Sequence, residues 1–74
     1  STLPAAFTKR KKAGRREFLR ARVRDGRVEV YPSEGSGRIA GLSWAEGLCE
    51  LPDEALDIGP GTPVTYHAWS SFGI

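Results

Sequence analysis

The sequence is poor in the residues that stabilise very small domains by cross-linking. It contains one cysteine, Cys49, so no disulfide forms within the chain. One cysteine and one histidine, His67, also cannot complete a four-ligand zinc site. The 74 residues therefore form one domain with a thin core, since a chain of this size buries only about 60 % of its unfolded surface.

Long apolar runs are also missing. No stretch approaches the roughly 20 apolar residues that a membrane-spanning helix needs. Basic residues occur near the start, but the apolar segment of a signal peptide does not follow them. Together with the unpaired cysteine, these absences predict a cytoplasmic protein with no membrane contact.

Charges of both signs are present but separated along the chain. Of the eleven Lys and Arg residues only Arg38 lies outside Lys9–Arg27, which leaves ten within it, and most acidic residues follow in the second half. The run Lys9–Arg16 has three interpretations, in decreasing weight: a solvated linker, a basic rim that attracts anions to a neighbouring active site, and a nucleic-acid surface. We do not expect nucleic-acid binding, because base-stacking aromatic residues are not interleaved with this run.

Residues 1–14 show neither the alternation of a strand nor a helical period. Pro4 and Gly14 interrupt the segment, and its neighbouring basic residues repel one another. We predict that residues 1–14 are a basic connecting arm from an upstream domain, with Leu3 and Phe7 packed on a core. Residues 15–74 then form the domain itself.

The clearest pattern is a β-hairpin from Glu17 to Tyr31. Apolar and basic residues alternate along Glu17–Arg24, as in a half-buried strand. The pair Asp25-Gly26 follows, which tolerates the positive φ angles of a type I′ turn. A two-residue turn fixes the register of the strands. The predicted pairs are Arg24–Arg27, Val23–Val28, Arg22–Glu29, Ala21–Val30 and Arg20–Tyr31.

The second half contains shorter signals. Pro32 ends the second strand, a glycine-spaced loop follows, and apolar spacing predicts a short helix near Arg38–Glu46. Short strands are predicted at Leu48–Leu51 and Val64–Trp69, separated by an acidic connection and by turn residues. The fold class is therefore mainly β: a small barrel-like domain of four or five short strands with one short helix.

No catalytic motif is complete in this sequence. His67 lies within a predicted strand, where a structural role outweighs a catalytic one. Cys49 also lies within a strand, where a small buried hydrophobic residue outweighs a reactive thiol. We predict no catalytic residue and no metal site in these 74 residues.

Two features suit anion binding. Arg20 stands mid-strand on the polar face opposite Tyr31, where its guanidinium either holds a phosphate or carboxylate in forked geometry or packs on the tyrosine ring. The residues alone weigh these two interpretations equally. The loop Gly35-Ser36-Gly37 precedes the predicted helix, so Ser36 either caps that helix, which is the default, or the loop binds an anion.

The order and spacing of these motifs resemble the C-terminal domain (domain IV) of the molybdopterin molybdenumtransferase family. This family includes the MoeA-type proteins of bacteria and the E domain of gephyrin in animals. The resemblance covers about Lys12–Trp69. It rests on Gly14–Arg20, the hairpin, Gly35–Gly37, Gly47-Leu48-x-x-Leu51-Pro52 and Leu56-x-x-Gly59-x-x-x-Val64.

The resemblance implies a small β-barrel that flanks a cleft between domains of a homodimer. Members of the family insert molybdenum from molybdate into adenylylated molybdopterin, with Mg²⁺, and release AMP. Their catalytic carboxylates and phosphate loops belong mostly to upstream domains, so no cofactor is expected on these 74 residues alone. Family residues that affect activity match Arg20 and Ser36 by motif.

The predicted anion-binding set is Arg15, Arg20, Gly35, Ser36 and Gly37. The sequence departs from the family near the loop, with Ala40-Gly41 in place of a common Ser-Ser pair and Arg38 in place of an apolar residue. The resemblance also leaves a second function open, because in gephyrin-like relatives this domain helps to hold a receptor peptide. The alternative is therefore a protein-binding module without a direct part in catalysis.

Overall fold

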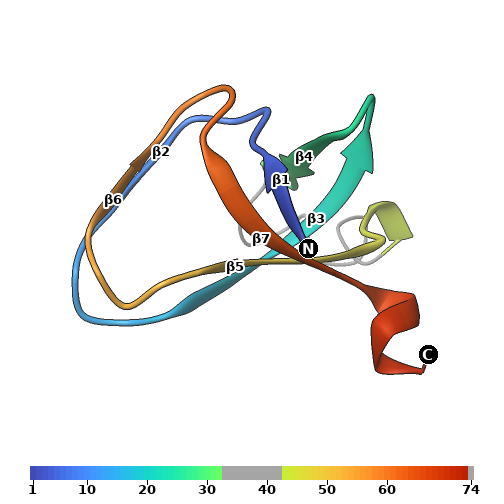
Figure 1. The fold of residues 1–74 in the computed structure, drawn as a ribbon. Coiled ribbons are helices and arrows are strands. Elements are labelled where there is room, and N and C mark those ends of the chain that lie inside the picture. Colours follow the sequence, from blue (N-terminus) through green and yellow to red (C-terminus); the bar gives the residue numbers. More distant parts are fainter. Residues whose placement is uncertain (33–42, 74) are drawn as a thin grey trace.

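The chain folds into a curled antiparallel sheet with a small second sheet beside it (Figure 1). This computed structural model describes residues 1–32 and 43–73. In sheet order, the main sheet contains β1 (Thr2–Pro4), β7 (Pro63–Ala68), β5 (Gly47–Leu51), β3 (Glu17–Arg24) and β4 (Arg27–Val30). The second sheet pairs β2 (Lys9–Lys11) with β6 (Leu56–Ile58), and the 3₁₀ turn η2 (Trp69–Phe72) follows β7.

The main sheet curls until its two edge strands meet. Just after β1, Ala5 forms an isolated bridge with Val28 of β4. The N–H of Ala6 also donates to the carbonyl oxygen of Val28 at 2.7 Å. The core lies inside this curl and contains Ala5, Ala21, Val28, Cys49, Leu51, Ile58, Val64 and Tyr66. The predicted fold class, a small barrel-like β domain, is confirmed.

The predicted hairpin is confirmed in position and register. Ladder partners run from Arg24 opposite Arg27 to Ala21 opposite Val30. Asp25 and Gly26 have φ angles of 54° and 73°, the positive values that the predicted turn requires. The strands at Leu48–Leu51 and Val64–Trp69 also exist, as β5 and β7, although Trp69 already belongs to η2.

Three strands lie where the sequence indicated none. Residues 1–14, without a visible period, contain β1 and β2, and the acidic connection contains β6. Leu3 and Phe7 pack against the core, as predicted. A connection from this segment to an upstream domain stays a prediction.

The short helix predicted at Arg38–Glu46 lies mostly outside the described residues. Of its described part, Ser43 and Trp44 are helical, whereas Ala45 and Glu46 are not. Within the described ranges, no helix is long and apolar enough to cross a membrane.

The register of β3, β5 and β7 determines which side chains share the outer face of the sheet. Arg20 lies opposite Leu48, and Leu48 lies opposite His67. Phe18 lies opposite Glu50 in the next row. Directly opposite residues in antiparallel strands project to the same side, so these five residues form one outer surface across three strands.

Candidate functional site

An open hollow of about 710 Å³ lies where the β3–β4 ladder ends. Strand β4 stops at Val30, and Pro32 has no N–H with which to continue the ladder. Strand β3 starts at Glu17, four residues before its first ladder partner of β4, so it extends beyond that strand. We call this cavity the Arg20 hollow; its lining includes Phe7, Thr8, Lys9, Phe18, Arg20 and Tyr31.

Arg20 occupies the predicted position on the outer face of β3. It is half-buried, and its carbonyl oxygen accepts a hydrogen bond from the N–H of Tyr31 at 2.9 Å. The Tyr31 ring contacts Trp44, with the two ring centroids 5.5 Å apart. The cation that stacks on the Trp44 ring is Arg22 and not Arg20; the Arg22 guanidinium lies 4.2 Å from the ring centroid. Among the described residues the cation–π contact on this face therefore belongs to Arg22, which favours anion binding for Arg20.

Lys9 brings a second cation to the Arg20 hollow. Its ammonium lies 3.6 Å from a carboxylate oxygen of Glu17, and both side chains remain about one-third exposed, at 35 % and 36 %. The pairing of β2 with β6, whose sequences are far apart, fixes its position. Sequence reasoning missed this residue because Lys9 stood within a basic run interpreted as a linker.

Of the other predicted anion-binding residues, only Arg15 lies within the described part of the chain. Arg15 is exposed between β2 and β3, and it does not line the cavity. Gly35, Ser36 and Gly37 lie outside the described residues. Anion contacts by these four residues, and by Arg20 itself, stay predictions.

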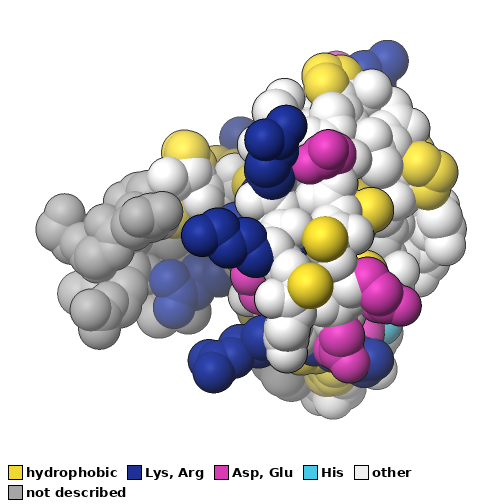
Figure 2. Space-filling model, turned by 90° about the vertical axis from the view of Figure 1, so that its left-hand side faces the viewer, with side chains coloured by type: hydrophobic (Ala, Val, Ile, Leu, Met, Phe, Trp, Pro, Cys, Tyr) yellow, Lys and Arg dark blue, Asp and Glu magenta, His cyan; other side chains and the backbone are white. Residues whose placement is uncertain are grey.

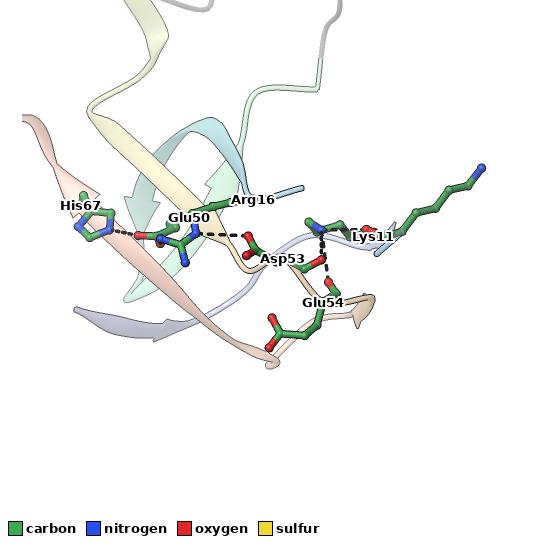
Figure 3. Close-up of polar contacts among 7 residues, drawn as sticks. Lys11, Arg16, Glu50, Asp53, Glu54 and His67 are labelled. Carbon is green, nitrogen blue, oxygen red and sulfur yellow. Dashed lines mark hydrogen bonds and ion pairs between the residues drawn. The ribbon is translucent and has the colours of Figure 1, made fainter. Parts of the chain in front are cut away.

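A second polar region, which we call the paired corner, contains Lys11, Arg16, Glu50, Asp53 and His67 (Figure 3). Arg16 forms ion pairs with two carboxylates: its Nη1 lies 3.1 Å from Glu50 Oε2, and its Nε lies 3.6 Å from Asp53 Oδ1. The other carboxylate oxygen of Glu50 lies 2.7 Å from His67 Nε2. Sequence spacing gave no carboxylate partner for His67; the register of β5 and β7 provides one.

Lys11 is the buried charged side chain of the paired corner, with 2 % of its surface exposed. Its Nζ donates to three backbone carbonyl oxygens, those of Lys12 at 2.8 Å, Glu54 at 3.3 Å and Asp53 at 3.4 Å. A buried ammonium is tolerated only when its donors are satisfied in this way. The interpretation of the basic run as a solvated linker is therefore wrong for Lys11.

In the fold, basic residues of the first half form ion pairs with acidic residues of the second half. Figure 2 views the side on which β2 and β6 lie in Figure 1, and it shows basic side chains beside acidic ones. Arg10 pairs with Asp57 at 3.1 Å, and Arg24 pairs with Glu46 at 2.9 Å. These partners compensate much of the basic segment, which disfavours an extended nucleic-acid surface.

Cys49 lies in the core and is fully buried. Burial raises the pKa of its thiol to about 11, so the thiol stays protonated at neutral pH. The predicted small buried hydrophobic residue is confirmed. Among the described residues, no group of three or more His, Cys, Asp or Glu side chains is placed to hold a metal ion.

Comparison with known proteins gives one family. The sequence model described as "MoeA C-terminal region (domain IV)" matches residues 2–69. Curated proteins and solved structures give no match. The matched residues include every strand of both sheets, from β1 to β7, and end at the first residue of η2. The chain therefore belongs to the MoeA C-terminal region (domain IV) family.

Proposed function

We propose that this chain is the C-terminal accessory domain of a molybdopterin molybdenumtransferase, an enzyme of molybdenum cofactor biosynthesis. The domain flanks the cleft in which molybdenum from molybdate is inserted into adenylylated molybdopterin. The observation that carries the proposal is the family match over residues 2–69. Arg20, which stands at the matching motif position, lines an open hollow together with Lys9 and supports it.

The described side chains can position an anionic substrate. The planar guanidinium of Arg20 offers parallel N–H donors to two oxygens of a phosphate or molybdate group. Lys9 adds a compact positive charge. Neither residue removes a proton or attacks a bond, so the chemical step belongs to the upstream domains of the parent enzyme.

Other features of the parent belong to the proposal as well. We expect a cytoplasmic homodimer whose upstream domains bind the molybdopterin-AMP substrate. Magnesium supplies charge neutralisation for phosphate groups in such enzymes. The described residues of this domain offer it no carboxylate cluster, so no step is assigned to magnesium here.

The test is the Arg20→Ala variant of the full-length parent enzyme. We expect molybdate-dependent AMP release to fall at least about tenfold, which corresponds to one lost charge-assisted contact. Circular dichroism and size-exclusion chromatography should show an unchanged fold and dimer. Arg27→Ala is the matched control, since Arg27 is exposed at the hairpin tip, away from the hollow. Wild-type turnover by Arg20→Ala refutes the role given to Arg20.

A second candidate function is the docking of a partner peptide. The exposed phenylalanines favour it: Phe18 is 55 % exposed and Phe72 is 52 % exposed. On this alternative the domain has no direct part in catalysis. A parent enzyme that lacks residues 1–74 but keeps its rate of molybdenum insertion supports docking and contradicts the accessory catalytic role.

A further inference from the structure

Three side chains form a stack beside the Arg20 hollow, and the proposed function assigns them no role. The rings of Tyr31 and Trp44 are tilted by 60° to each other, with their centroids 5.5 Å apart. The guanidinium of Arg22 lies 4.2 Å from the centroid of the Trp44 ring. We call Arg22, Trp44 and Tyr31 the Trp44 stack. Of these three described residues only Tyr31 lines the hollow itself.

Arg22 attaches one end of the Trp44 stack to the hairpin. Its Nε donates to Glu29 Oε1 at 2.8 Å, and Glu29 is its ladder partner across β3 and β4. The Arg22 side chain is 28 % exposed, so water screens its contact with Trp44 only in part. A cation over an aromatic ring is attracted to the ring face, and more strongly when both are partly desolvated. Trp44 therefore packs on a guanidinium that the hairpin holds in place.

Tyr31 connects the other end of the Trp44 stack to Arg20. The Tyr31 N–H donates to the carbonyl oxygen of Arg20 at 2.9 Å, which continues the β3–β4 register one pair beyond β4. Opposite residues in antiparallel strands project to the same side, and both side chains line the hollow. The ladder ends here, because Pro32 has no N–H. Beyond this end of the ladder, the contact with Trp44 fixes the Tyr31 ring at the wall of the hollow.

We infer that Trp44 is a positioning residue, which holds the Tyr31 ring where it restricts the Arg20 side chain to rotamers that face the hollow. An unrestrained arginine side chain populates many rotamers, and ordering it opposes binding of an anion. Trp44 also holds the Arg22 guanidinium on its own ring, which leaves Arg20 as the guanidinium at the hollow among the described residues. The inference rests on the proposed function and deepens it, because it names what orients Arg20.

The test uses the full-length parent enzyme and its molybdate-dependent release of AMP. Trp44→Ala should lower kcat/KM about fivefold, because Arg20 then samples unproductive rotamers. Trp44→Phe keeps a ring for Arg22 and Tyr31, so its kcat/KM should stay within about twofold of wild type. Circular dichroism and size-exclusion chromatography check the fold and the dimer of each variant. Equal losses in Trp44→Phe and Trp44→Ala contradict a role for the ring contacts and overturn the inference.

Trp69→Ala is the matched control for Trp44→Ala. Trp69 is half-buried like Trp44, and its Nε1 donates to the carbonyl oxygen of Ala45 at 3.0 Å. It does not line the hollow and is not part of the Trp44 stack. Trp69→Ala should lower the urea midpoint of the domain but leave kcat/KM near wild type. Equal losses of kcat/KM in the two tryptophan variants refute the positioning role.

A double-mutant cycle separates positioning of Arg20 from a merely structural role. In the Arg20→Ala parent enzyme, Trp44→Ala should lower kcat/KM further by less than about twofold, since Trp44 acts through Arg20. A further loss of about fivefold in that background shows that Trp44 acts independently, and it overturns the inference. Arg22→Gln is a milder second probe, because glutamine keeps a donor for Glu29 but removes the cation from Trp44. It should lower kcat/KM about threefold in the wild-type enzyme and leave Arg20→Ala unchanged.

Failure of the inference is distinguishable from failure of the proposed function. Wild-type turnover by Trp44→Ala, together with impaired turnover by Arg20→Ala, refutes only the positioning role. Wild-type turnover by Arg20→Ala refutes the role of Arg20 in the proposed function, and the positioning role with it.

Discussion

The paired corner and the Arg20 hollow contain similar basic residues in opposite surroundings. In the paired corner, Arg16 has two carboxylate neighbours, and Lys11 donates to three carbonyl oxygens. In the Arg20 hollow, Lys9 has one longer ion pair, at 3.6 Å, and Arg20 has none within the described residues. The smaller cavity beside the paired corner, of about 250 Å³, is lined by Arg16 and Glu50, which neutralise each other.

The difference separates structural charge from charge that remains to bind a ligand. A cation whose hydrogen bonds are already made gains little from a new anion, because it must first lose its partners. A cation that lines an open cavity keeps its donors for a ligand. The count of basic residues in Lys9–Arg27 therefore says little about ligand binding, and the position of each one in the fold decides it. Substitutions in the two regions should accordingly affect different measurements.

The largest effect on stability is expected for Lys11→Met. Methionine keeps the shape of the buried chain but leaves carbonyl oxygens of the paired corner without their donor, at a cost of about 2 kcal/mol. Urea denaturation followed by the fluorescence of Trp44 and Trp69 measures this loss. Lys12→Met is the exposed control and should stay near wild type. Equal stability of the two variants contradicts the assigned role of Lys11.

Smaller losses of stability are expected for Arg16→Ala and Arg20→Ala. The first should affect mainly stability, and the second should affect mainly function. Arg16 is 54 % exposed, so loss of its ion pairs should cost no more than about 1 kcal/mol, and less at high salt. Arg20→Ala should change stability by less than about 0.5 kcal/mol. Molybdate-dependent AMP release by the parent enzyme should fall at least about tenfold in Arg20→Ala and stay near wild type in Arg16→Ala. A single variant that loses both stability and function would contradict the distinction between the paired corner and the Arg20 hollow.

The smallest effect concerns the exposed pair Arg24–Glu46, which joins β3 to the residue before β5. Its hydrogen bonds, at 2.9 and 3.1 Å, lower the pKa of Glu46 below its ordinary value of 4.5. The unfolded chain therefore binds the proton more readily. The stabilisation is present above the ordinary carboxyl pKa and is lost as the pH falls through the lowered pKa. Urea midpoints measured at falling pH should decline less in Glu46→Gln than in the wild-type chain.

Local signals allowed part of this structure to be predicted. The hairpin depends on neighbours in sequence, so alternation and Asp25-Gly26 were sufficient for its register. Strands β2 and β6 have three residues each and pair across 47 residues, from Lys9–Lys11 to Leu56–Ile58, so they have no visible period. Burial of Lys11 could not be predicted, because two of its three carbonyl partners, those of Asp53 and Glu54, are distant in sequence.

The candidate site was predictable to the same limited extent. Arg20 was identified because its place on the polar face and its partner Tyr31 follow from the hairpin alone. Lys9 and Phe7 were missed as members of the hollow, since only the β2–β6 pairing places them there. Phe18 looked like an ordinary strand residue; it is exposed because it lies on the outer face of β3, beyond the end of β4 at Val30.

The pairing of β1 with β7 has a consequence for the synthesis of the chain. Within this domain Thr2–Pro4 is translated well before its ladder partners, Pro63–Thr65. The hairpin from Glu17 to Tyr31 can form during translation, because its contacts are local. The sheet cannot close around its core until β7 is released from the ribosome, so folding of the whole domain is delayed until then. Until then the apolar face of the hairpin stays exposed, and this interval is when the chain is most prone to aggregation.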